Sequence, residues 1–125
     1  MNDKPMPALR NFSAGLIVLA EVGPDRMTVT QGAFFLIAGL ADQAGRPATF
    51  SEIRETLGDV LNKSLHTTYK VFLEEGRNRE GKREPGLGWL SRETDAADNR
   101  RKYLRLTNRG RQIMAEVASA LAAAH

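Results

Sequence analysis

The stretch of sequence that decides the fold is GWLSRETDAADNRRKYLRLTNRG, residues 88–110. Two short segments, 87–93 and 102–107, are predicted as strands, because apolar and polar residues alternate in the second and a Trp-Leu pair anchors the first. The polar stretch 94–101 connects the two segments and ends in two arginines. The pattern predicts a β-hairpin with a strongly basic exit from its loop, which we call the wing.

A helix-turn-helix is predicted directly upstream of the wing, over about 49–75. Thr49 precedes a short helix with Glu52 at its third position, as in a capping box, and Gly58 ends that helix. A second helix, the recognition helix, is predicted from about 61 to 75. Its apolar face is formed by Leu61, Leu65, Tyr69 and Phe72. The helix pair alone is weak evidence, because every amphipathic helix pair has a polar outer face. A helix-turn-helix followed by a two-stranded hairpin is a winged helix.

Three more helices are predicted outside this unit. One covers about 8–22, Thr28 or Thr30 caps a second that ends near Gln43, and Thr107 caps a third that covers 108–124. The first helix is apolar on more than one stripe, which favours a second buried surface against another subunit. The residues predicted for dimerisation are Leu9, Phe12, Leu16, Leu19, Ile113, Val117 and Leu121. The alternative is ordinary packing of these residues on the winged-helix core.

The formal net charge of +3 is distributed unevenly along the chain. Residues 1–61 carry a net charge of −2, residues 62–111 carry +6 from 13 basic and 7 acidic side chains, and the last 14 residues carry −1. A basic segment within a near-neutral chain is typical of polyanion binding. On charge alone, a solvated charged surface is an equally good interpretation.

Composition excludes several classes of protein. The length of 125 residues fits one domain, 1–125, and the absence of cysteine excludes disulfides, thiolate zinc sites and thiol-based sensing. The two histidines, His66 and His125, are far apart, so we expect no metal site and no cofactor. The apolar run 14–20 is much shorter than the roughly 20 residues of a membrane helix. We therefore expect a soluble, cytoplasmic protein that does not enter membranes.

The segment 76–86, GRNREGKREPG, has no apolar residue, three glycines and one proline. This composition predicts a basic loop inserted between the recognition helix and the wing. Two interpretations stay open: the loop adds phosphate contacts, or it is a mobile, solvated loop. Its basic residues are Arg77, Arg79, Lys82 and Arg83.

Six residues of the wing resemble the corresponding pattern of MarR-family transcriptional regulators, Asp-x-x-Asp-x-Arg followed by Leu-Thr-x-x-Gly. They are Asp95, Asp98, Arg100, Leu106, Thr107 and Gly110. The resemblance covers about 8–118. It implies a mainly α winged-helix fold in which the N- and C-terminal helices form a dimerisation region. It also implies a dimeric repressor that binds a pseudo-palindromic operator in double-stranded DNA. Many members of the family bind a small-molecule effector, but no convergent charged or aromatic set in this sequence defines such a pocket. The inserted loop 76–86 and the short C-terminal region depart from the family pattern.

The candidate DNA-binding residues come from four places. They are Thr49 and Ser51 at a helix N-terminus, Lys63, Ser64, His66, Thr67 and Lys70 on the recognition helix, the four basic residues of the inserted loop, and Asp98, Arg100 and Arg101 in the wing. The resemblance implies that Asp98 orients Arg100; alternatively this pair only ties the hairpin turn together. His66 is equally well interpreted as an exposed residue that contacts nothing.

Two other function classes fit the sequence less well than DNA binding. A winged helix used as a protein-interaction or assembly module predicts apolar anchors on the wing and recognition helix, where this sequence has Lys, Arg and Thr. An enzyme is not expected, because no nucleophile–base pair and no phosphate-binding glycine loop is recognisable.

Overall fold

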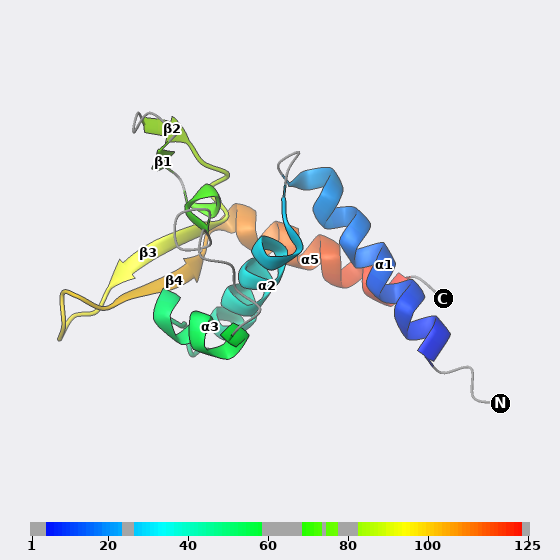
Figure 1. Ribbon diagram of the computed structural model, residues 1–125, viewed down its shortest axis with the longest axis horizontal. Coiled ribbons are helices and arrows are strands. Elements are labelled where there is room, and N and C mark those ends of the chain that lie inside the picture. The colour runs from blue at the N-terminus through cyan, green and yellow to red at the C-terminus, as the bar shows by residue number, and fades with distance from the viewer. Residues whose placement is uncertain (1–4, 24–26, 59–68, 74, 78–82, 124–125) are drawn as a thin grey trace.

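The computed structural model describes residues 5–23, 27–58, 69–73, 75–77 and 83–123. Its helices are α1 (Pro5–Val22), α2 (Val29–Gln43), α3 (Phe50–Leu57), the 3-10 helix η2 (Tyr69–Phe72) and α5 (Asn108–Ala123), and its strands are β1 (Glu75–Arg77), β2 (Arg83–Pro85), β3 (Leu90–Thr94) and β4 (Lys102–Leu106). Helices α1 and α5 pack together at one end, and the hairpin β3–β4 extends from the opposite end (Figure 1). This is the predicted winged-helix fold.

Two helices begin at capping boxes. The Thr28 hydroxyl oxygen accepts a hydrogen bond from the Gln31 N–H at 3.0 Å, and the Gln31 side chain accepts one from the Thr28 N–H at 2.9 Å. Thr49 and Glu52 repeat this arrangement at the start of α3, and Gly58 ends α3 with a φ of 58°. These caps satisfy N–H groups that a helix leaves without an internal partner. The cap at Thr49 was predicted from the sequence, and of the two alternatives for α2, Thr28 and Thr30, the structure has Thr28.

The predicted recognition helix does not extend to Glu75. Tyr69–Phe72 form a 3-10 helix and Glu75 already lies in strand β1, while 59–68 lie outside the described residues. Tyr69 and Phe72 are buried, as their predicted apolar face requires. The helical pattern stops after Phe72 because the carbonyls of the 71–73 segment accept hydrogen bonds from the chain that leads into the wing.

The same hydrogen bonds shorten the first wing strand. The N–H groups of Leu87, Gly88 and Trp89 donate to the carbonyls of Val71, Leu73 and Phe72, so these residues do not pair with β4. Strand β3 therefore begins at Leu90, three residues later than predicted, and pairs antiparallel with β4 from Leu90↔Leu106 to Thr94↔Lys102.

The wing hairpin is also held against the chain before α3. An isolated bridge joins Thr49 to Tyr103, and the Leu104 N–H donates to the Ala48 carbonyl at 2.8 Å. The N-terminus of α3 is therefore fixed beside the wing.

The prediction of a loop at 76–86 was wrong at both ends. Strands β1 and β2 form a small antiparallel hairpin with Arg77 opposite Arg83 and Glu75 opposite Pro85. Backbone hydrogen bonds form this ladder, and its strands contain no apolar side chain. The sequence therefore lacks the alternating apolar pattern from which strands are predicted. Residues 78–82 lie outside the described part of the chain.

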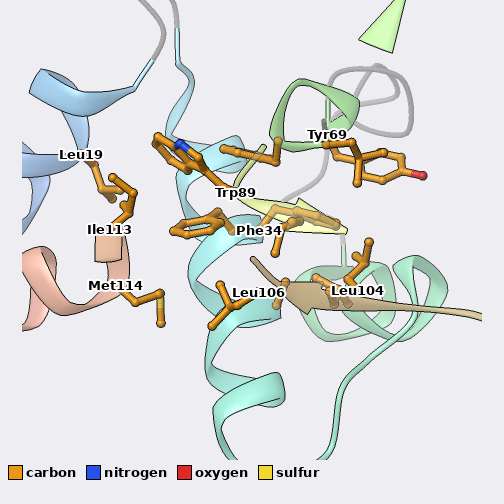
Figure 2. Packing of buried hydrophobic residues seen from close by; sticks show 14 of the residues in the cluster. Leu19, Phe34, Tyr69, Trp89, Leu104, Leu106, Ile113 and Met114 are labelled. Carbon is orange, nitrogen blue, oxygen red and sulfur yellow. The ribbon is translucent and has the colours of Figure 1, made fainter. Parts of the chain in front are cut away.

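The core is centred on buried aromatic rings from α2, from η2 and from the segment just before β3 (Figure 2). The Phe35 ring centroid lies 4.9 Å from that of Trp89 and 5.5 Å from that of Phe72. Gly110, at the start of α5, packs directly on this layer, because a Cβ there would lie 2.0 Å from the Trp89 carbonyl oxygen. Only glycine allows α5 to approach so closely, which gives the glycine of the Leu-Thr-x-x-Gly pattern a packing role.

Part of the predicted dimerisation set lies in the core of the chain itself. Leu19, Ile113 and Val117 are buried between α1 and α5, and Leu121 is half-buried over Gly15. Leu19, Ile113 and Val117 thus pack in the core of their own chain, and whether these three and Leu121 also contribute to a dimer stays a prediction. Part of the apolar periodicity of α1 and α5 therefore reflects their contact with each other within one chain. No helix within the described ranges has the length and apolar character needed to cross a membrane.

Candidate nucleic-acid interface

A groove with a volume of about 750 Å³ lies between the start of α3 and the wing. Four basic side chains line it: Arg92, Arg100, Arg101 and Lys102. The first turn of α3 forms the other wall, through Thr49, Ser51 and Glu52. The structure thus brings four predicted DNA-binding residues, from segments about 50 positions apart in sequence, into one groove: Thr49, Ser51, Arg100 and Arg101.

The α3 side of the groove is a helix N-terminus with its cap in place. The Thr49 hydroxyl is occupied by its capping bond to the Glu52 N–H, at 3.2 Å. Ser51 is exposed at the second helical position. The backbone N–H groups of a first helical turn attract anions, because they carry the positive end of the helix dipole. This wall can therefore bind a phosphate through its backbone.

The wing turn is organised by Asp95. One carboxylate oxygen accepts the N–H groups of Ala97 at 2.7 Å and Asp98 at 3.2 Å, and the other accepts the Tyr103 hydroxyl at 2.5 Å. The hydroxyl of Tyr103, followed by the N–H of Ala97, holds the pKa of Asp95 below its usual range. Asp95 is the first residue of the Asp-x-x-Asp-x-Arg pattern in the sequence. These contacts show that it shapes the turn, which the pattern alone did not indicate.

Asp98 contacts Arg100 in two ways. Its Oδ1 accepts the Arg100 backbone N–H at 3.0 Å and lies 3.4 Å from the guanidinium Nε. The first contact ties the turn together, and the second is a long, exposed contact that only favours one direction for the side chain. The Arg100 side chain is 93% exposed. The guanidinium therefore projects from the wing with both terminal nitrogens accessible to a ligand.

Arg101 points in a different direction from Arg100. Its Nη2 lies 3.2 Å from Glu52 Oε1 on α3, and its guanidinium carbon lies 5.6 Å from the centroid of the Tyr103 ring. No local sequence pattern reveals this pair, because its members are 49 residues apart. Arg101 therefore closes the groove between the wing and α3 instead of projecting freely.

A second long-range ion pair fixes the wing to α2. Arg105 Nε lies 2.6 Å from Asp42 Oδ1, while Asp42 Oδ2 accepts the Leu106 N–H at 2.8 Å. The Asp42 side chain is only 5% exposed, and Arg105 also contacts Glu93 across the hairpin at 2.7 Å. Hydrogen bonding to Asp42 raises the pKa of Arg105. This network fixes the angle at which the wing leaves the body of the protein.

The other predicted DNA-binding residues are only partly covered by the structure. Lys70 is exposed on η2. Arg77 and Arg83 are paired in register on β1 and β2. The remaining ones lie outside the described residues: Lys63, Ser64, His66, Thr67, Arg79 and Lys82.

A separate apolar surface lies on α1, at the end of the molecule opposite the wing (Figure 1). Five large apolar side chains there are 41–62% exposed: Met6, Leu9, Phe12, Leu16 and Ile17. The surface continues into a cavity of about 250 Å³ between α1 and α2, lined almost wholly by apolar residues. Of the predicted dimerisation residues, Leu9, Phe12 and Leu16 belong to this α1 surface.

One comparison with known proteins, that with solved structures, supports this architecture. No family model matches the sequence, and no curated protein matches it. Among solved structures, the chain is similar to a transcriptional repressor, CouR, bound to a 23-mer DNA duplex. The similarity covers 94% of this chain and 68% of that one, with 26% sequence identity and a TM-score of 0.57. The chain therefore shares its winged-helix fold, over nearly its whole length, with a repressor whose structure includes DNA.

Proposed function

We propose that this protein is a transcriptional regulator of the MarR type that binds double-stranded DNA as a dimeric repressor. The observation that carries the proposal is the basic groove between α3 and the wing, on a fold similar to that of a DNA-bound repressor. Guanidinium groups and a helix N-terminus are both suited to DNA phosphates.

In the proposed complex, the groove lies along the DNA backbone and Arg100 extends into the adjacent minor groove, where negative potential is concentrated. Arg92 and Lys102 contact phosphates beside it. The base-reading residues are those predicted for the recognition helix, Lys63, Ser64, His66, Thr67 and Lys70. Arg77, Arg79, Lys82 and Arg83 add phosphate contacts from the segment 76–86.

The proposed dimer uses the α1 surface. An exposed apolar patch on a small protein is typical of an interaction surface, and a second copy would cover both the patch and the cavity beside it. Two-fold symmetry then places two recognition helices about 34–36 Å apart, which matches a pseudo-palindromic operator.

The proposal is tested by fluorescence anisotropy with a labelled duplex over a range of salt concentrations. We expect binding that weakens steeply with salt, and Arg100→Gln to reduce the salt slope by about 1 and weaken binding to all sequences. Arg111→Gln is the matched control, because Arg111 is an exposed arginine on α5, beyond the base of the wing. Absence of duplex binding by the wild type at low salt would refute the proposed function. Equal effects of the two substitutions would refute the role of Arg100.

A further inference from the structure

One acidic side chain lies within the basic groove. Glu52 is half-exposed, and its Oε1 accepts the Thr49 N–H at 3.1 Å, the Thr49 hydroxyl at 3.0 Å and Arg101 Nη2 at 3.2 Å. The same oxygen therefore completes the cap of α3 and binds the wing. Hydrogen bonds from Thr49, and to a lesser degree Arg101, hold the pKa of Glu52 below its usual range, so it is ionised at neutral pH.

The Glu52 carboxylate offers Arg101 the kind of contact that a DNA phosphate would offer. Carboxylate and phosphate oxygens both accept charge-assisted hydrogen bonds from guanidinium groups. The side chains of Arg101 and Glu52 are 50% and 52% exposed, and an ion pair in water at this exposure is weak and exchangeable. A phosphate entering the groove can therefore replace Glu52 without disrupting the fold.

We infer that Glu52 is a positioning residue that occupies Arg101 in the DNA-free protein, and that binding a duplex requires Arg101 to exchange this carboxylate for a backbone phosphate. The inference rests on the proposed function. On this inference the Glu52 carboxylate competes with DNA phosphates for Arg101 and lowers the affinity for every duplex, whatever its sequence.

The chain itself indicates how to separate the two roles of Glu52. The capping box of α2 uses Gln31 where that of α3 uses Glu52, so a glutamine side chain completes the same cap without a negative charge. Glu52→Gln should therefore preserve α3 and release Arg101. We expect its affinity for a duplex at low salt to rise about two- to tenfold, an effect that shrinks as salt increases.

A double-mutant cycle tests whether Glu52 acts through Arg101. Glu52→Gln, Arg101→Gln and the double variant are compared by anisotropy, with thermal unfolding to verify the cap. Glu55→Gln, the same charge change on the same helix, is the control. We expect the gain from Glu52→Gln to disappear in the Arg101→Gln background and to exceed that of Glu55→Gln.

Three results would overturn the inference while leaving the proposed function intact. Glu52→Gln could bind duplex DNA with wild-type affinity, or Glu55→Gln could gain as much affinity as Glu52→Gln. The third is that Glu52→Gln raises the affinity by the same factor in the Arg101→Gln background. If the wild type binds no duplex at low salt, the proposed function fails, and the inference fails with it.

Discussion

At the scale of single residues, the shape of the wing depends on Asp95. Its two oxygens bind two backbone N–H groups within the turn and the hydroxyl of Tyr103 on β4. These contacts favour the ionised carboxylate and hold its pKa below the usual range. A lowered pKa in the folded state means that ionised Asp95 stabilises the fold above about pH 4, and that this contribution is lost as pH falls through the folded-state pKa.

Removing the hydroxyl of Tyr103 should therefore raise the pKa of Asp95. In Tyr103→Phe the largest cause of the lowered pKa is gone, while the N–H bonds of Ala97 and Asp98 remain. We expect the pKa of Asp95 to move toward its ordinary value and the acid stability of the wing to decrease. A carbon-detected NMR titration of the Asp95 carboxyl measures this shift directly. An unchanged pKa would show that the hydroxyl does not stabilise the carboxylate.

At the scale of elements, the start of α5 depends on Thr107. Its hydroxyl oxygen accepts the Gly110 N–H at 3.0 Å and its hydroxyl donates to the Gly88 carbonyl, so one side chain caps α5 and binds the segment before β3. Thr107→Ala removes both bonds and should lower the free energy of unfolding by about 1–2 kcal/mol. Thr107→Ser keeps the hydroxyl and is expected to stay near wild type in urea unfolding. Equal losses in the two variants would contradict the capping role.

The attachment of the wing to α2 depends on Asp42. Asp42→Ala leaves the Leu106 N–H and Arg105 without their buried acceptor, so we expect the free energy of unfolding to fall by about 1–3 kcal/mol. Glu93→Gln removes the charge of the exposed partner of Arg105 and should change the free energy of unfolding by less than about 1 kcal/mol. Chemical denaturation of both variants tests whether Asp42→Ala is the more destabilising of the two. A larger effect at Glu93 would show that the buried contact does not hold the wing.

Elements whose signals are local in sequence were predictable, and those fixed by distant contacts were not. The caps at Thr28 and Thr49 each involve a partner three residues away, so a short pattern reveals them. Strand β4 follows from the alternation of apolar residues, and the Trp-Leu pair indicates β3, which begins three residues later than predicted. The pairs Glu52–Arg101 and Asp42–Arg105, by contrast, join residues 49 and 63 positions apart and leave no periodic trace. The basic character of the wing was predicted, but neither the groove beside it nor the carboxylate within that groove was.

At the scale of the whole molecule, the two ends of the protein have different chemistry. The wing end is basic, and the α1 end exposes an apolar surface although the core residues of α1 are already buried against α5. Apolar periodicity alone did not separate these two roles of α1, because one helix carries both stripes. Burial separates them: Leu19 belongs to the core, whereas Phe12, 57% exposed, belongs to the outer surface.

The outer surface of α1 should therefore control assembly without controlling folding. We expect Phe12→Asp to give a monomer at micromolar concentration in size-exclusion chromatography with light scattering, because a charge cannot be buried unpaired in an apolar interface. Its affinity for sites that the wild type selects from random duplex DNA should fall about 100-fold or more, since only one half-site is then engaged. Leu40→Asp, at a similarly exposed leucine of α2, should remain dimeric. A dimeric Phe12→Asp variant, or dissociation caused equally by Leu40→Asp, would move the interface away from α1.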